Sequence, residues 1–169
     1  MQRQVLRLNV SSLAILIMAT GLSLPASAID LQPGDATAPP PGLRSIQLSY
    51  LNAERVGASN ARIDQTQVQF RYTQAFELNN KPALFYLHTG SGKNQPAGAL
   101  ASYAADNGTI DTTLVFAYWP YVDRASKTYV GVAGYLITPT GSYSSDRAIN
   151  MGENRYRWAG QIAYQTRIA

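Results

Sequence analysis

The sequence contains no cysteine and one histidine, His88, and these scarcities exclude several classes of function. Without cysteine there are no disulfides, thiolate zinc sites, iron–sulfur clusters or cysteine nucleophiles. A single histidine excludes histidine-rich metal sites and leaves one candidate for histidine-dependent catalysis. Charged residues are also scarce, at 14% of 169 residues, whereas about 25% is usual for soluble domains. Because tyrosine is frequent at the same time, with 11 residues, the composition is typical of a chain that contacts more than water.

The first 28 residues have the parts of a secretory signal peptide. A positively charged start is followed by an apolar run over residues 13–24 and by small residues at Ala26 and Ala28. The apolar run is short for a spanning helix, which argues against an uncleaved anchor. We therefore predict an exported protein that is cleaved between Ala28 and Ile29.

The predicted mature chain has little net charge. When Arg3 and Arg7 are taken from the 14 basic residues, 12 remain against 10 acidic residues, so the net charge is near +2. Nucleic-acid binding needs a basic surface, and none is indicated here, so we expect no nucleic-acid partner.

The mature N-terminus, residues 29–42, is rich in proline and glycine. Four prolines fix φ and lack the N–H donor, so this segment forms neither a helix nor a regular strand. We predict a periplasmic lead-in that delivers the chain to its first strand.

From residue 43 onward, apolar and polar residues alternate, which predicts β-strands. The clearest run, Ile63 to Leu78, is longer than the five or six residues of a common strand, and a tilted membrane strand needs about 9–11. Its apolar side chains, Val68, Phe70, Tyr72, Phe76 and Leu78, share one face. Other strands are predicted around 46–50 and over 82–89, 109–119, 128–138 and 156–168. Six long strands without a helix between them predict an antiparallel, all-β meander.

The connections between these strands differ in length. Residues 79–81 and 120–127 are short connections, whereas 90–108 and 139–154 are longer and more polar, and 55–62 joins the first two strands. Outer-membrane barrels have short periplasmic turns and longer outer loops. Aromatic residues near the strand ends fit two interfacial girdles, with Phe76, Phe85, Trp119 and Tyr121 on the periplasmic side and Tyr143, Tyr156 and Trp158 on the outer side. The lipid bilayer of the outer membrane is the expected surrounding, and a soluble secreted β-sandwich remains the alternative.

The polar faces of the second and last strands are candidate lumen-facing rows. They comprise Gln65, Gln67, Gln69 and Arg71, and Arg155, Arg157, Gln161 and Arg167. In a barrel such rows either contact solutes or fill the interior with hydrogen-bonded side chains.

No motif for catalysis or cofactor binding is present in the sequence. His88 and Ser91 are three residues apart, which places them on opposite faces of a regular strand. Asp106, Asp111 and Asp146 are dispersed and are interpreted as solvated loop acids rather than as a calcium site. We predict no catalytic residue, no metal site and no cofactor, and we expect Glu153 to pair with arginines beside it.

Two segments near the C-terminus carry a family resemblance. Pro139-Thr-Gly-Ser-Tyr143, and Gly152-Glu-Asn-Arg155 with Trp158 shortly after, resemble segments of the phenol meta-pathway degradation family of outer-membrane proteins. Pro33-Gly34-Asp35 followed by Pro40-Pro41-Gly42 resembles the start of the mature chain in that family. The resemblance implies a membrane β-barrel, inserted by the barrel-assembly machinery, that moves small hydrophobic or aromatic compounds. A scaffold or adhesion barrel that acts through its long loops is the alternative.

The length departs from that family, whose barrels are nearly twice as long as this mature chain. Six strands are fewer than the minimum of about eight in outer-membrane barrels, and unpaired strand edges are prohibitive in lipid. The chain also ends without a terminal aromatic residue. We therefore expect residues 43–169 to be the N-terminal part of a longer barrel, with a barrel shared between several chains as the alternative.

Overall fold

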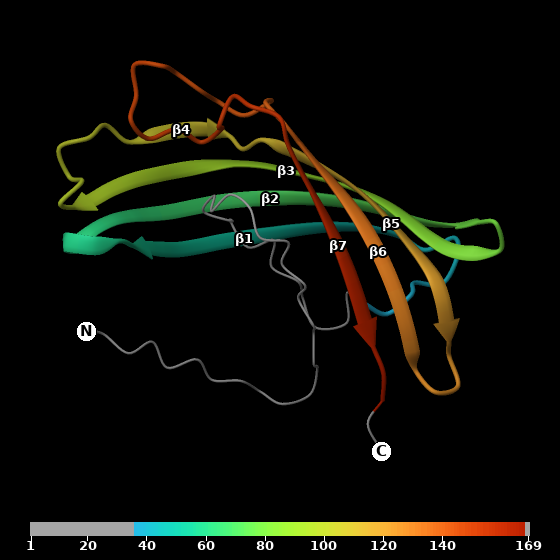
Figure 1. Cartoon of the computed structure of the whole chain (residues 1–169). Helices are drawn as coiled ribbons and strands as arrows, with labels where there is room; N and C mark the ends of the chain where they lie inside the picture. Colours follow the sequence, from blue (N-terminus) through green and yellow to red (C-terminus); the bar gives the residue numbers. More distant parts are fainter. Residues whose placement is uncertain (1–35, 168–169) are drawn as a thin grey trace.

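The computed structural model describes residues 36–167, which form one antiparallel sheet of seven strands (Figure 1). The strands are β1 (Arg44–Val56), β2 (Ala61–Leu78), β3 (Lys81–Gly98), β4 (Asp106–Thr109), β5 (Thr112–Asp123), β6 (Thr128–Thr138) and β7 (Arg157–Gln165). Their spatial order is β1-β2-β3-β5-β6-β7, with β4 paired to β3. The predicted antiparallel, all-β class is confirmed. The predicted signal peptide, with Ala28 and Ile29, lies outside the described residues.

Three connections are shorter than predicted, and the one between β5 and β6 comprises only residues 124–127. A single 3-10 turn, η1 (Ala58–Asn60), joins β1 to β2. Asn79 and Asn80 join β2 to β3 with φ of 50° and 57°, the left-handed conformation that asparagine tolerates in two-residue hairpins. Across residues 36–167, no helix is long and apolar enough to span a membrane.

Residues 90–108 were predicted as a loop, and this prediction was wrong. Strand β3 continues to Gly98 and pairs with β2 along its whole length, up to Ala61 opposite Gly98. Asp106–Thr109 then returns along β3 as a separate strand, so the sheet has seven strands and not six. The segment is rich in Gly, Ser, Ala and Asn, and Gly, Asn and Ala are depleted in strands, but pairing with the 18-residue β2 outweighs this local preference.

The two faces of the sheet differ in polarity, as the alternation predicts. One face presents apolar side chains to the outside: Leu48 is 72% exposed and Trp158 is 86% exposed. A β-sandwich would cover this face with a second sheet. All strands of the described part instead belong to one sheet, so the soluble-sandwich alternative is wrong.

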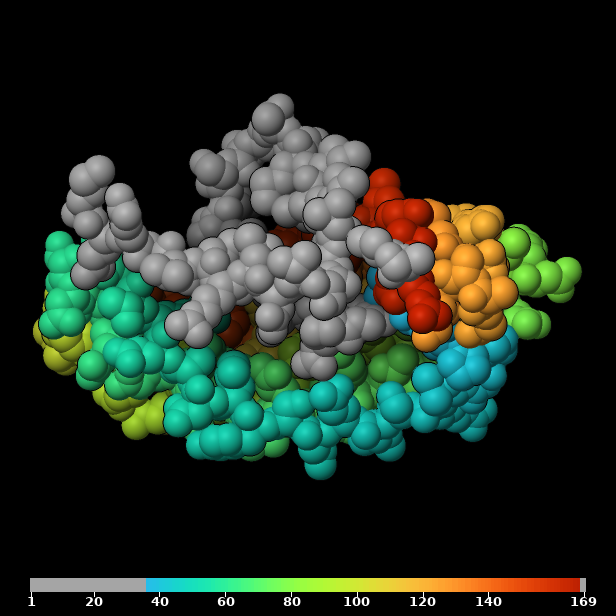
Figure 2. All heavy atoms as spheres, turned by 90° about the horizontal axis from the view of Figure 1, so that it is seen from below, coloured from blue at the N-terminus to red at the C-terminus, as the bar shows by residue number. Residues whose placement is uncertain are grey.

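The sheet is strongly curved, and Figure 2 views it from below, with β1 along one margin and β6 and β7 along another. Two local features accompany the bending. The register shifts between Tyr118 and Tyr121, where Pro120 interrupts the ladder of β5. On β3, a Cβ at Gly92 would lie 2.1 Å from the carbonyl oxygen of Thr66. Glycine therefore lets β3 approach β2 more closely than any side chain would allow.

The end of the proline-rich segment packs against the concave face. Ala38 is buried in a cluster with Ala117, Trp119 and Tyr129. The Nε1–H of Trp119 donates a 2.9 Å hydrogen bond to the carbonyl oxygen of Ala36. Arg124 donates to the carbonyl oxygen of Ala38 at 3.4 Å. Within the described part of the predicted lead-in, residues 36–38 thus belong to the interior packing, whereas residues 40–42 are exposed.

Candidate functional site

A row of residues crosses the concave face from one margin of the sheet to the other. The pairing register places these residues side by side on successive strands: Gln47, Arg71, His88, Thr113, Ile137 and Arg157. Because paired residues share a face, side chains two residues before or after each of these also lie on the concave side. This face is therefore where the predicted polar rows of the second and last strands meet.

The glutamines of β2 form a buried polar strip on this face. Gln65 and Gln67 are almost fully buried, at 6% and 5% exposure. The amide nitrogen of Gln69 donates a 2.8 Å hydrogen bond to Oε1 of Gln67. The side chains of Gln67 and Gln69 lie close to the positions where Gly92 and Gly90 lack a Cβ. The strip is therefore packed against β3 and held by its own hydrogen bond.

Arg71 and His88 lie opposite each other on β2 and β3. The guanidinium carbon of Arg71 is 4.8 Å from the centre of the Tyr86 ring, a cation–π contact. Ser91 pairs with Val68, on the other face of the sheet from His88. The predicted separation of His88 and Ser91 is confirmed, and the two residues cannot form a nucleophile–base pair.

Beside Arg71, the concave face contains a cavity of about 150 Å³. Its walls come from β2, β3, β5, β6 and β7 and include Leu84, Tyr86, Val115, Trp119, Tyr135 and Gln161. The hydroxyl of Tyr135 donates a hydrogen bond to Oε1 of Gln161. The cavity is therefore lined mainly by apolar and aromatic side chains, with a small number of polar groups.

Asp106 and Asp111 are not solvated loop acids, so that interpretation was wrong. Asp106 is 1% exposed, forms an ion pair with Arg147 and accepts a 2.7 Å hydrogen bond from the backbone N–H of Met151. Asp111 accepts 2.8 Å hydrogen bonds from the backbone N–H groups of Gly141 and Glu153. Both acids thus fasten residues 139–156 to the sheet, and spacing in the sequence could not reveal these partners.

The Gly152–Arg155 segment has the ion pairs expected from the sequence. The Glu153 carboxylate binds Arg155 at 2.8 Å through one oxygen and Arg157 at 3.1 Å through the other. Gly152 and Gly141 pack so closely that a Cβ on either would lie 2.7 Å from the other. This close approach gives a physical reason for the glycines in both of the segments that carry the family resemblance.

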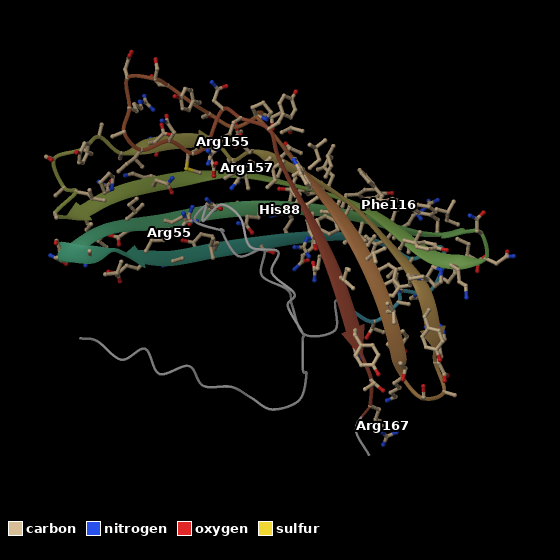
Figure 3. All side chains as sticks on the ribbon, in the orientation of Figure 1. Arg55, His88, Phe116, Arg155, Arg157 and Arg167 are labelled. Carbon is tan, nitrogen blue, oxygen red and sulfur yellow. The ribbon has the colours of Figure 1, made fainter. Side chains whose placement is uncertain are left out.

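The predicted residues of the last strand do not form one row. Arg157 and Gln161 lie on β7, on the concave face. Arg155 precedes the strand and is bound to Glu153. Figure 3 shows Arg155 and Arg157 close together and Arg167 at the opposite end of β7. The predicted residues are therefore divided along the strand. Arg155 and Arg157 lie where the loop enters β7, Gln161 lines the cavity, and Arg167 lies at the far end.

Comparison with known proteins identifies the family. The family model described as "Putative MetA-pathway of phenol degradation" matches residues 52–168, which is more than half of the chain. The chain belongs to this family. No curated protein matches the chain.

A solved structure shares the fold of this family member. It is the crystal structure of an outer membrane channel from Pseudomonas putida F1, with a TM-score of 0.69 and 24% sequence identity. The match covers 82% of this chain and 55% of the channel, so the chain spans little more than half the length of that protein. The sheet of this family member therefore has the fold of part of an outer-membrane barrel.

Several residues of the family member's concave face were missed or misplaced by the sequence reasoning. Trp119 was assigned to a periplasmic girdle, but it is 3% exposed and lies in the interior cluster, so this assignment was wrong. Tyr86 and Tyr135 were not predicted as lining residues. Tyr86 is two residues from His88 on β3, and Tyr135 is two residues from Ile137 on β6. Residues two apart on a strand share a face, so the register would have placed both tyrosines on the concave face.

The described part of the family member offers no cluster for a metal ion. Within residues 36–167, no three His, Asp or Glu side chains come together as a ligand set. The cavity beside Arg71 offers apolar walls, aromatic surfaces and a small number of hydrogen-bonding groups to a small ligand.

Proposed function

We propose that this chain forms part of an outer-membrane β-barrel through which small hydrophobic or aromatic compounds cross passively. The observation that carries the proposal is the single curved sheet with an apolar face open to its surroundings. Apolar side chains such as Leu48, Ile162 and Trp158 are largely exposed there, over strands at both margins. A continuous exposed apolar surface of this kind is stable against lipid and not against water.

The comparisons support the same proposal. The similar fold belongs to an outer membrane channel, and the family's description refers to phenol degradation, which favours aromatic solutes. Export by the predicted signal peptide and insertion by the barrel-assembly machinery complete the proposal. The glutamines of β2 and the concave-face residues Arg157 and Gln161 of β7 would then line the lumen, and the protein would carry no catalytic centre.

The structure favours a channel over a scaffold or adhesion barrel. An adhesion barrel would present its long loops as a free binding surface. The longest connection, residues 139–156, is instead fastened to the sheet through Asp106 and Asp111. A loop held in this way is placed to shape the outer mouth of a lumen.

Solute flux tests the proposal. The complete barrel that contains this chain, purified from outer membranes, would be reconstituted into liposomes, and entry of one-ring aromatic solutes would be followed by stopped-flow spectroscopy. Solutes with a polar substituent are preferred because their leak through plain lipid is slow. We expect entry several times faster than into empty liposomes and little change for a disaccharide. Equal rates with and without protein would reject the channel and favour the scaffold.

A further inference from the structure

The cavity on the concave face has the size of one aromatic ring. Its volume of about 150 Å³ is close to that of an engineered protein cavity that accepts benzene. It is built from five neighbouring strands and from Ala36, so it belongs to the packed interior and not to a loop surface. A solute that passes along this face would meet a compartment that fits a single ring.

The walls of the cavity are chemically suited to such a ring. Leu84, Val115 and Ala117 provide aliphatic contacts, and the indole of Trp119 provides a flat aromatic surface. This indole is fixed by its hydrogen bond to Ala36 and by Gly131, because a Cβ there would lie only 3.1 Å from its Nε1. The aromatic wall is therefore held in place before any solute arrives, which lowers the entropy lost on binding.

Arg71 gives the cavity a positive charge, and no carboxylate within residues 36–167 forms an ion pair with it. It is the one charged residue among those that line the cavity. The ion pairs of the described residues involve Arg62, Arg147, Arg155 and Arg157, and none joins Arg71 to a carboxylate. Its partners in the register, Gln47 and His88, are not acids. The cavity therefore favours a ligand that brings its own negative charge.

The cation–π contact between Arg71 and Tyr86 is compatible with the recognition of a planar anion. A guanidinium that stacks through its face keeps its N–H donors in its own plane. Those donors match the two oxygens of a carboxylate, which they bind in a paired geometry. The contact with the Tyr86 ring also restricts the Arg71 side chain, so less freedom is lost when the anion binds.

Resting on the proposed channel function, we propose that this cavity binds one-ring aromatic carboxylates, such as benzoate, during their passage. The ring occupies the space between Trp119 and the aliphatic walls, and the carboxylate pairs with Arg71. Phenol, which is neutral at pH 7, fits the walls but lacks the charge. Acetate carries the charge but lacks the ring. The site therefore selects the combination of both features.

Tryptophan fluorescence provides a direct binding assay. The chain has two tryptophans, Trp119 in the cavity and Trp158 on the exposed apolar face. In a Trp158→Phe background, all tryptophan fluorescence comes from Trp119. Benzoate is expected to change its emission saturably. Benzyl alcohol should bind at least about tenfold more weakly, because a hydrogen bond to a charged group contributes on the order of that factor. Acetate should also bind more weakly, because it has no ring to bury against the apolar walls.

Two variants separate charge from space. Arg71→Gln should weaken benzoate binding about tenfold or more and leave benzyl alcohol unchanged, and Arg71→Lys should restore part of the affinity. Ala133→Leu keeps Arg71 but places a larger side chain in the cavity wall, so it should abolish binding of both ring compounds. Arg55→Gln, on the same face of β1 but away from the cavity, is the matched control and should bind as the parent does. Heat-modifiability on gels checks that every variant is folded.

The outcomes distinguish this inference from the proposed channel. Benzoate binding no tighter than that of benzyl alcohol, or unaffected by Arg71→Gln in a folded protein, would overturn the inference. Displacement of benzoate by chloride alone at equal concentration would do the same, because it would indicate a general anion site. If the protein passes neutral aromatic solutes but shows no benzoate site, the channel stands and this inference fails. If benzoate binds but no solute crosses, the site stands and the channel fails.

Discussion

Gln47 and Leu48 are neighbours on β1, and their side chains point to opposite faces of the sheet. Leu48 is paired with Phe70 on the apolar face, whereas Gln47 is paired with Arg71 on the concave face. If the apolar face meets lipid, Leu48→Arg places a charge in the hydrocarbon and should cost about 2–4 kcal/mol near the bilayer midplane. Gln47→Arg should cost little. Urea unfolding of the membrane-inserted protein measures both values, and equal costs would contradict the assignment of the faces.

Gly92 and Gly134 both lie in strands, but a side chain at Gly92 would collide with a neighbouring strand and one at Gly134 would not. A Cβ at Gly92 would lie 2.1 Å from the carbonyl oxygen of Thr66, whereas a Cβ at Gly134 has no atom within 4 Å. Gly92→Ala should therefore destabilise the fold by roughly 1–3 kcal/mol or more, because β2 and β3 must separate. Gly134→Ala should stay within about 0.5 kcal/mol of the parent. Similar stabilities of the two variants in unfolding experiments would show that β3 does not need this close approach.

At the scale of single residues, alternation in the sequence predicted which face most strand residues share. It placed Gln65, Gln67 and Arg71 together on one face, and the register has them there. It failed for Trp119, because an aromatic residue near a strand end fits an interfacial girdle and an interior cluster equally well. What decides between them is Ala36, which is 83 residues away and accepts the indole hydrogen bond. The alternation of residues around Trp119 carries no information about this distant contact with Ala36.

At the scale of elements, the buried carboxylate of Asp106 is one of the two that fasten residues 139–156 to the sheet. Asp106 holds Arg147 and the backbone of Met151, whereas Asp146 is exposed and its carboxylate accepts a hydrogen bond from the neighbouring Ser145. Asp106→Asn should cost about 1–3 kcal/mol, since a buried acceptor for a charged donor loses its charge. We expect faster proteolysis within residues 139–156 and no such change for Asp146→Asn. Equal protection of the two variants in timed protease digestion would show that other contacts hold this connection.

The strands themselves were predicted unevenly, and the difference has a physical cause. Strand β2 was predicted almost completely because its two faces differ sharply in polarity. The second half of β3 was not, because Asn94, Gln95, Pro96 and Gly98 have low strand preference and no apolar face. These residues are in a strand because β2 offers them an unbroken line of hydrogen-bond partners. Pairing of this kind is a property of two elements, so one segment alone cannot predict it.

At the scale of the whole molecule, the sheet has two ends that we expect to lie on opposite sides of the membrane. The short turns 79–80 and 124–127 are at one end, and the connections 99–105 and 139–156 are at the other (Figure 1). Short turns of outer-membrane barrels face the periplasm. This orientation follows from connection lengths, and it can be tested independently of the solute that the channel passes.

The absence of cysteine from the sequence makes that test simple, because a single introduced cysteine has no background. Ser145 and Ala125 are both exposed and lie at opposite ends of the sheet. In intact cells, a membrane-impermeant maleimide should label Ser145→Cys. It should label Ala125→Cys only after the outer membrane is permeabilised, because that turn then becomes accessible. Labelling of Ala125→Cys alone in intact cells would invert the orientation. Equal labelling of both without permeabilisation would mean that the sheet does not cross the membrane, and the apolar face would then need a protein partner to cover it.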